Sequence, residues 1–235
     1  MKEYIITDLT RFSHNNTVCI ALVDPETGDF VRPQPYIANE SCKKLHLQPG
    51  AKIQGVFTPK VGAVKPHIED STYGPLRSFG PCSKEEFKGV LEKTLFPSVP
   101  KGFGVEFDKY QKLIKNDDAP ERSIITIKIN PKSLSIHEDQ YNKGKIKASF
   151  TDAEGNYFSY LSITDRRFFD YAKKHFDDGK LDTVVDFLHA QEELYLRVGL
   201  SRHWKHPSDG REGYWLQVNG IYTFPSYPEE INLYE

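Results

Sequence analysis

Two hairpin-like segments place the strongest constraint on what this 235-residue chain can fold into. In the first, the apolar run TVCIALV (17–23) leads through the turn sequence DPETGD into a short return segment ending at residue 33. In the second, IKASF and YFSYLSI flank the turn sequence TDAEGN (151–156). Apolar or alternating segments joined by Pro, Gly, Asp and Asn are typical of antiparallel strands and tight turns. The two hairpins therefore predict a mainly β chain.

Further strand and helix signals occur in both halves. Additional strands are expected at residues 3–9, 51–57, 123–129, 193–200 and 213–224. A capping box of Ser83 and Glu86 opens one helix, which Pro97 ends, and two more helices are expected near 164–175 and 181–188. Each half thus offers four or five strands with one or two helices, the inventory of a small five-stranded barrel of the OB type. We expect a mainly β, α+β fold of two OB-like barrels packed together.

The polar stretch 131–145 is the best candidate for a boundary, because it lacks apolar periodicity. We expect a first barrel with one helix at 1–130, a connecting segment at 131–145 and a second barrel with one or two helices at 146–235. The similar hairpin turns are compatible with duplication of one barrel. The Leu-[Ser/Thr]-Arg segment is also repeated, but in a different order. It precedes the hairpin in the first half and follows it in the second. Duplication stays open at this point.

Charge and cysteine content limit the class of partner and the compartment. Residues 1–130 carry 18 Lys and Arg against 16 Asp and Glu, a net +2, and residues 131–235 carry 13 against 17, a net −4. Neither half is a generally basic nucleic-acid-coating module, so any nucleic-acid partner must be held by a local patch. Three cysteines without CxxC spacing argue for a reducing compartment. With no apolar stretch long enough for a leader or a span, we expect a cytoplasmic protein without membrane contact.

Candidate binding residues cluster where strands end. Leu9-Thr10-Arg11 and Leu200-Ser201-Arg202 each place an arginine after an expected strand, and the loop that follows Arg202 is rich in basic and aromatic residues. An arginine fork binds phosphate bidentately, and indole or phenol rings can stack on bases. In the alternative interpretation, the aromatic residues are core and the arginines are solvated. The predicted nucleic-acid-binding residues are Arg11, Arg32, Tyr36, Arg202, His203, Trp204, Lys205, Arg211, Trp215 and Tyr222.

Motifs for a metal, a cofactor or catalysis are not found. His203 and His206 have an HxxH spacing, but no cysteine or carboxylate stands at a familiar offset to complete a zinc site. Nucleotide loops of the GxxxxGK[ST] or GxGxxG type and a GxSxG elbow do not occur. The Glu86-Phe87-Lys88 triplet lies on an expected helix, where residues i and i+2 point apart. We therefore predict no metal, no cofactor and no catalytic residue.

Two parts of the chain carry a family resemblance. ITDLTRF with VCIALVDPETGDFVRPQP near the start, and LYLRVGLSRHW with GYWLQVNGIYTFP near the end, are similar to the dual OB-containing domain family of prokaryotic conflict and phage-defence systems. The hallmark segments are Gly199–Arg202 and Trp215–Ile221. The resemblance implies two OB-like barrels in one bacterial protein, with a role in binding or sensing nucleic acid or nucleotides.

Three functions remain in view. The first is a nucleic-acid- or nucleotide-binding module that senses its ligand, in which strand-end arginines grip phosphate and aromatic residues stack on bases. The second is a protein-interaction module whose partner belongs to a defence system. The third is a nucleotide-processing enzyme that recruits carboxylates such as Asp8 and Asp165. Salt dependence separates the first two, because phosphate contacts release counterions.

Overall fold

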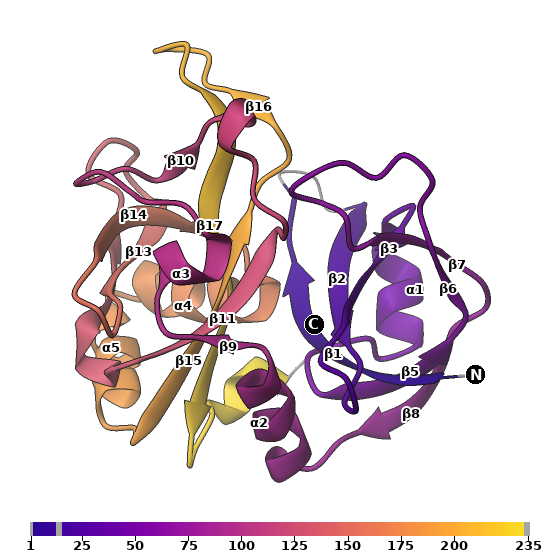
Figure 1. Cartoon of the computed structure of the whole chain (residues 1–235). Coiled ribbons are helices and arrows are strands. Elements are labelled where there is room, and N and C mark those ends of the chain that lie inside the picture. The colour runs from indigo at the N-terminus through magenta and orange to yellow at the C-terminus, as the bar shows by residue number, and fades with distance from the viewer. Residues whose placement is uncertain (1, 13–15, 233–235) are drawn as a thin grey trace. The chain divides into compact units, whose positions relative to one another are not determined.

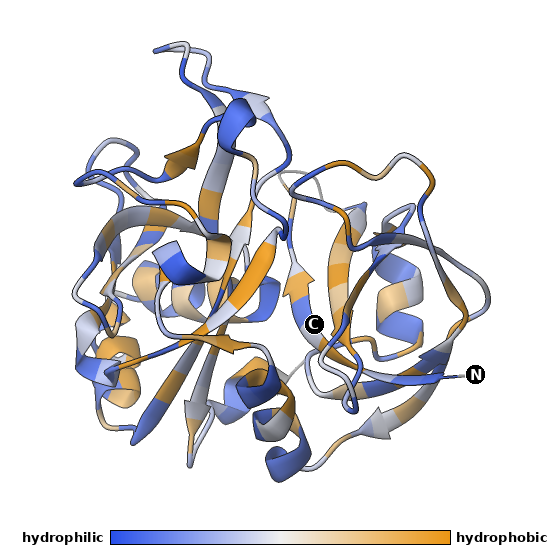
Figure 2. Cartoon of the chain, viewed as in Figure 1, coloured by the Kyte–Doolittle hydropathy of each residue, from blue (hydrophilic) through white to orange (hydrophobic). Residues whose placement is uncertain are grey.

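Residues 2–12 and 16–232 are described by the computed structural model, and the chain divides into two units, Met1–Leu95 and Phe96–Glu235. Both units are built mainly of strands, as expected (Figure 1). Hydrophobic segments concentrate on the strands, whereas many loops and the outer faces of the helices are hydrophilic (Figure 2). This distribution reflects burial of the strand side chains, which lie in the core of each unit.

The strands of unit 1 follow the order of an OB barrel. Val56 alone separates β5 from β6, so the two form one bent strand that pairs with β1 through β5 and with β7 through β6. The path β1-β2-β3-β7-β6/β5 then returns to β1, with β3 and β7 parallel and the other neighbours antiparallel. The strands are β1 (Lys2–Thr10), β2 (Thr17–Val23), β3 (Phe30–Gln34), β4 (Ile37–Ala38), β5 (Ala51–Gly55), β6 (Phe57–Pro59), β7 (Asp70–Tyr73) and β8 (Arg77–Pro81).

Two helices complete unit 1, α1 (Asn39–Lys44) and α2 (Lys84–Lys93). The capping box at the start of α2 is confirmed: the Glu86 amide donates to Ser83 Oγ at 3.0 Å and the Ser83 amide donates to Glu86 Oε2 at 2.7 Å. Val90 of α2 packs with Ile5 in the core. A local sequence signal thus sets the start of this helix, and its apolar face attaches it to the barrel.

Unit 2 has the same strand order. The short 3-10 turn Pro131–Ser133 joins β11 to β12, so these two strands form one bent first strand. The path β11/β12-β13-β14-β17-β15 returns to β11, again with the third and fifth strands, β14 and β17, parallel. The strands are β9 (Leu95–Phe96), β10 (Leu113–Ile114), β11 (Ile124–Ile129), β12 (Leu134–Glu138), β13 (Ile146–Thr151), β14 (Tyr157–Ile163), β15 (Glu193–Leu200), β16 (Trp204–Lys205) and β17 (Glu212–Phe224).

The helices of unit 2 are α3 (Val99–Phe103), α4 (Arg166–Asp177) and α5 (Leu181–His189). Helices α4 and α5 lie between the third and fourth strands of the barrel, as a helix does in an OB fold. Asp165 caps α4, because its carboxylate accepts the Phe168 amide at 3.1 Å and also the Ile221 amide of β17 at 3.1 Å. Phe168 and Leu188 are buried in the core of the unit.

The boundary between the units differs from the expected one. It lies at Leu95–Phe96, and not in the stretch 131–145. Residues 124–129 and 134–138 are β11 and β12, which pair with β15 and β13 of unit 2. The stretch 131–145 resembled a linker in the sequence because several side chains of β12 and most of those in the loop after it are exposed to solvent. The first barrel is therefore shorter than expected, and the second is longer.

The two hairpin turns occupy equivalent places in the two barrels. Both connect the second strand to the third, and both use an aspartate side chain to hold the turn. Asp24 Oδ1 accepts the Glu26 amide at 2.7 Å, and Asp152 Oδ1 accepts the Glu154 amide at 3.0 Å. The arginine echo is different, since Arg11 follows the first strand of its barrel and Arg202 follows the fourth. The repeated turn is thus a property of the fold, whereas the repeated arginine is not.

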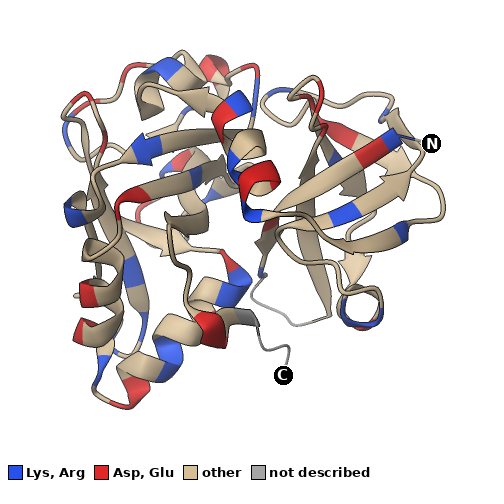
Figure 3. Ribbon diagram, turned by 90° about the horizontal axis from the view of Figure 1, so that it is seen from below, with Lys and Arg blue, Asp and Glu red and all other residues tan. Residues whose placement is uncertain are grey.

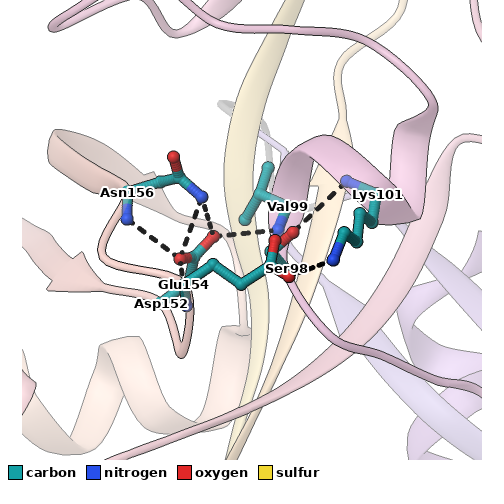
Figure 4. Close-up of polar contacts among 6 residues, drawn as sticks. All are labelled: Ser98, Val99, Lys101, Asp152, Glu154 and Asn156. Atoms are coloured by element: carbon teal, nitrogen blue, oxygen red, sulfur yellow. Dashed lines mark hydrogen bonds and ion pairs between the residues drawn. The ribbon is translucent and has the colours of Figure 1, made fainter.

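The Asp152 turn also anchors the segment that precedes the second barrel. Asp152 Oδ2 accepts the Val99 amide at 3.0 Å, and Lys101 forms an ion pair with Glu154 (Figure 4). Asn156 donates its side-chain amide to both carboxylate oxygens of Asp152 at 3.1 Å. These contacts hold α3 against the barrel. The stretch 97–122 is therefore attached to unit 2 and supplies β10 to it.

Candidate functional site

A pocket of about 420 Å³ lies on one face of the second barrel. It is built by the second, third and fifth strands of that barrel, by the loops after its first and fourth strands, and by the residue before β10. The hairpin of β16 and β17 projects from this end of the unit (Figure 1). The residues lining the pocket are Lys112, Lys145, Lys147, Tyr160, Ser162, Ser201, Trp204, His206, Trp215, Leu216 and Gln217.

An irregularity in β14 shapes the floor of the pocket. Tyr160 has a φ of 55°, and the register between β13 and β14 shifts beside it. A tyrosine in this left-handed conformation needs support. The Tyr160 amide donates to Ser149 Oγ at 3.0 Å, its hydroxyl donates to Gln140 Oε1 at 3.1 Å, and its ring packs on His137 at 4.7 Å. Tyr160 and Ser162 both line the pocket.

Lys147 enters the pocket from β13, directly opposite Ser162. Its Nζ donates to Ser162 Oγ at 3.0 Å and lies 3.9 Å from Asp139 Oδ2. Burial lowers the pKa of Lys147 from its ordinary value, against the opposing effect of Asp139. Asp139 is itself held by the Tyr141 amide at 2.9 Å, a bond that favours its charged form. Lys147 is thus a half-buried cation with a distant counter-ion.

Lys112 is positioned by the pairing of β10 with β17, in which its carbonyl accepts the Leu216 amide at 2.9 Å. Its Nζ donates to the Tyr160 carbonyl at 3.2 Å. Within the described part of the chain, no carboxylate oxygen lies within 4.0 Å of this ammonium group. Burial, followed by the charges of Lys147 and Arg211, lowers the pKa of Lys112. The pocket therefore holds a half-buried cation that no described carboxylate contacts, and the charge of Asp139 opposes the lowering of its pKa only from a distance.

Positive charge in this unit is a local property of the pocket. Lys112, Lys145 and Lys147 contribute three positive charges and Asp139 one negative, a net +2. Residues 96–235, which make up unit 2, carry 19 Lys and Arg against 22 Asp and Glu, a net −3. Viewed from the end opposite β16, Lys and Arg are interspersed with Asp and Glu along the ribbon (Figure 3). The acidic balance of the region is thus compatible with an anion site.

Two indole rings form the aromatic side of the pocket. The rings of Trp204 and Trp215 are 5.8 Å apart at 66°, and the imidazole of His206 lies 5.3 Å from Trp204. Trp215 is fixed by its amide, which donates to Ser201 Oγ at 2.9 Å, and by the Arg211 guanidinium 5.0 Å from its ring. Trp204 is 47% exposed. One ring is therefore held firmly, and the other offers an open face.

The structure brings only two of the ten sequence-predicted residues into this pocket, Trp204 and Trp215. Four others lie exposed on the same loop and hairpin: Arg202, His203, Lys205 and Arg211. His203 and Lys205 contact the Glu212 carboxylate at 3.3 and 3.7 Å, and Arg211 contacts Asp209 at 2.7 Å. Tyr222 is buried and packs near Tyr227 with the ring centres 6.0 Å apart.

The remaining predicted residues belong to unit 1. Arg32 is only 5% exposed, and its Nε donates to Asp70 Oδ1 at 2.8 Å. The pair forms because β3 and β7 align Arg32 with Asp70 in parallel register. Tyr36 packs its ring on Phe12 at 4.7 Å, and Arg11 is partly exposed at the end of β1. Burial makes Arg32 a structural residue, and this corrects its interpretation as a surface phosphate grip.

The carboxylates considered for catalysis are structural as well. Asp8 is buried in unit 1 and accepts the Thr7 hydroxyl at 2.8 Å, and Asp165 of unit 2 is the cap of α4. Over residues 2–12 and 16–232 there is also no cluster of three His, Cys, Asp or Glu side chains that could hold a metal.

The residues that sequence reasoning missed come from segments interpreted as connections or as plain strands. Lys112 lies in 97–122, Lys145 lies in 131–145, and Lys147, Tyr160 and Ser162 lie in the second hairpin. The alternation of IKASF and YFSYLSI places Lys147, Tyr160 and Ser162 on the solvent side of that hairpin. This alternation was the signal available in the sequence. Its use required knowing which face of the barrel binds a ligand.

A family model described as dual OB-containing domain matches residues 6–221. The chain belongs to the dual OB-containing domain family. No curated protein matches the sequence. OB folds commonly bind oligonucleotides on the face of strands two and three and with the loops after the first and fourth strands. The pocket of this dual OB-containing chain lies at that place in the second barrel. None of its described helices is long and apolar enough to cross a membrane.

Proposed function

We propose that the second barrel of this dual OB-containing protein binds nucleic acid or a nucleotide in the Lys112–Lys147 pocket. The observation that carries the proposal is Lys112, a half-buried ammonium group beside Lys147 with no carboxylate within 4.0 Å among the described residues. Burying an unbalanced charge costs free energy, which a bound anion repays. Phosphate is the anion that the surrounding aromatic residues suit.

The indole side of the pocket supports a base as the second part of the ligand. Stacking of a base on an aromatic side chain contributes about 1–3 kcal/mol in single-strand binders and tolerates any base. Trp204 presents an exposed ring close to Trp215, and both line the pocket that holds the lysines. Phosphate on the lysines and a base on Trp204 describe one nucleotide unit. Exposed Arg202, Lys205 and Arg211 extend the basic surface along the same loop for a longer strand.

Fluorescence anisotropy with short single- and double-stranded DNA and RNA, at two salt concentrations, tests this function. The affinity should fall as the salt concentration rises, because the release of counterions from the phosphates then favours binding less. Lys112→Met should lose most of the affinity, and Lys115→Met is the matched control, since Lys115 is exposed and does not line the pocket. Binding that Lys112→Met leaves intact would contradict the assignment of the pocket.

The first barrel supports a second candidate function, a protein-interaction module. The loop between β6 and β7 exposes Val61 at 98%, Val64 at 70% and Ile68 at 48%. Apolar side chains gathered on one loop are typical of a protein contact. Titration calorimetry with a candidate partner protein tests it. Val61→Asp should weaken that contact at any salt concentration, and Lys112→Met should not.

We infer the cellular role from the family resemblance that the sequence carries. The dual OB-containing family is associated with prokaryotic conflict and phage defence, so we propose a cytoplasmic sensing module of such a bacterial system. Ligand binding in the second barrel would be the sensing event, and the first barrel would pass it to a protein partner. Plaque counts on cells that carry the intact system or its Lys112→Met variant test this role. Equal protection by both would argue against ligand sensing by this pocket.

A further inference from the structure

We propose that the pocket selects a terminal phosphate monoester, such as a phosphorylated strand end or a mononucleotide, over an internal phosphodiester. The inference rests on the proposed function and adds the chemical class of the ligand. It follows from the charge, the unused hydrogen-bond donors and the size of the pocket.

The charge of the pocket matches a dianion. Lys112, Lys145 and Lys147 against Asp139 leave a net +2, with the acid 3.9 Å from Lys147 and more than 4.0 Å from the other two lysines. A phosphate monoester has a second pKa of about 6 and is mostly dianionic at neutral pH, whereas a diester carries a single negative charge. A diester would neutralise only one of these two net charges, which come from the half-buried Lys112 and Lys147 and the exposed Lys145.

The donors of the pocket also suit the three oxygens of a terminal phosphate. Each lysine ammonium has three N–H donors. Lys112 spends one on the Tyr160 carbonyl, and Lys147 spends one on Ser162 Oγ. Two donors remain on each of them. A terminal phosphate offers three non-ester oxygens to these donors. A diester offers two, because its third oxygen is bonded to the second ester carbon.

The size of the pocket favours one nucleotide. A volume of about 420 Å³ is near the lower end of the range of small-ligand pockets, about 300–1,000 Å³. The phosphate-binding lysines and the Trp204 ring line the same enclosure. The ligand portion that enters is therefore one phosphate with its sugar and base, and any further nucleotides follow the exposed loop outward.

Titration calorimetry with matched ligands tests the inference. The ligands are thymidine 5′-monophosphate, its phosphate methyl ester, thymidine, and one short single strand with a 5′-phosphate, a 3′-phosphate or neither. All are measured at one neutral pH, at which the monoester is mostly a dianion. The monophosphate should bind at least about 10-fold more tightly than its methyl ester. The strand arms tell whether a free nucleotide, a 5′ end or a 3′ end is preferred.

Two protein variants make the result specific to the pocket. Lys112→Met should reduce the preference for the monoester to near onefold, while Lys115→Met should keep it. Equal affinities for the monophosphate and its methyl ester would overturn the inference and leave the proposed function standing, provided that the strands bind. If neither the nucleotides nor the strands bind, the proposed function fails together with the inference.

Discussion

Replacing Lys112 by methionine should stabilise the protein and abolish its ligand binding at the same time. Among the described residues, the side chain makes a single polar contact, with the Tyr160 carbonyl at 3.2 Å, and this hydrogen bond contributes about 1 kcal/mol. Burial and the charges of Lys147 and Arg211 lower the pKa of Lys112, so the fold disfavours its charged form. Methionine keeps the length of the side chain and removes the charge. We expect the free energy of unfolding to rise by about 0.5–1 kcal/mol, the low end of what such replacements give.

For ligand binding, the Lys112→Met substitution is expected to be unfavourable. A hydrogen bond to a charged group contributes about 1.5–3 kcal/mol, so loss of the Lys112–phosphate contact should weaken the affinity about 10- to 150-fold. Urea unfolding and titration calorimetry on the same preparation measure both quantities. A rise in the melting temperature of about 1–4 °C should accompany the stabilisation. If Lys112→Met destabilises unit 2, or binds as tightly as the wild type, the reasoning from an unbalanced charge is refuted.

The pH dependence follows from the same shift. The folded-state pKa of Lys112 lies below its unfolded-state value, so the unfolded chain holds more protons between the two. The stability of the wild type should therefore increase with pH across that interval, and the advantage of Lys112→Met should shrink. A bound phosphate raises the lysine pKa again, so the affinity should fall as pH rises through the lowered free-state pKa. Unfolding and binding series between about pH 7 and pH 10 check both trends.

Four further changes have defined outcomes. Trp204→Ala should lower nucleotide affinity about 5- to 150-fold by removing a stacking ring, with unchanged urea unfolding because the side chain is exposed. Arg32→Met should destabilise unit 1 by about 3–5 kcal/mol, measured by urea unfolding, because its buried carboxylate partner stays behind. Asp152→Ala should cost about 2–4 kcal/mol in the same assay, because the amides of its turn and of α3 lose their acceptor. Gly199→Ala should cost about 1–3 kcal/mol, because its Cβ would lie 2.1 Å from Asn219 Nδ2.

Local signals predicted individual elements well. The apolar run at 17–23 is β2 with the same bounds, and the Ser83 capping box starts α2 as expected. These features depend on residues a few positions apart, so one sequence contains all the information they need. The two hairpin turns and the mainly β fold followed in the same way. Membership of the dual OB-containing family agrees with the resemblance seen in the strand-end segments.

The place of the boundary could not be predicted in this way. β11 pairs with β15, about 70 positions later in the chain, and only that pairing assigns residues 124–129 to the second barrel. A strand bent at Pro131–Ser133 resembles two short strands with a linker when it is considered alone. Pairing between distant strands depends on how the whole barrel closes, which local composition does not encode.

By itself, the sequence determined most of the long strands, the two hairpin turns, the cap of α2 and the tryptophans that could stack on a base. Tertiary structure alone decided which charged residues are buried as structural pairs and which line the pocket. Arg32 was an attractive phosphate ligand in the sequence, and parallel pairing of β3 with β7 buries it beside Asp70. Lys112 and Lys147 were ordinary lysines, and barrel closure brings them from separate segments into one pocket. The physical reason is that the energy of a charge depends on solvent exposure and on neighbouring charges, and both are set by residues far away in the chain.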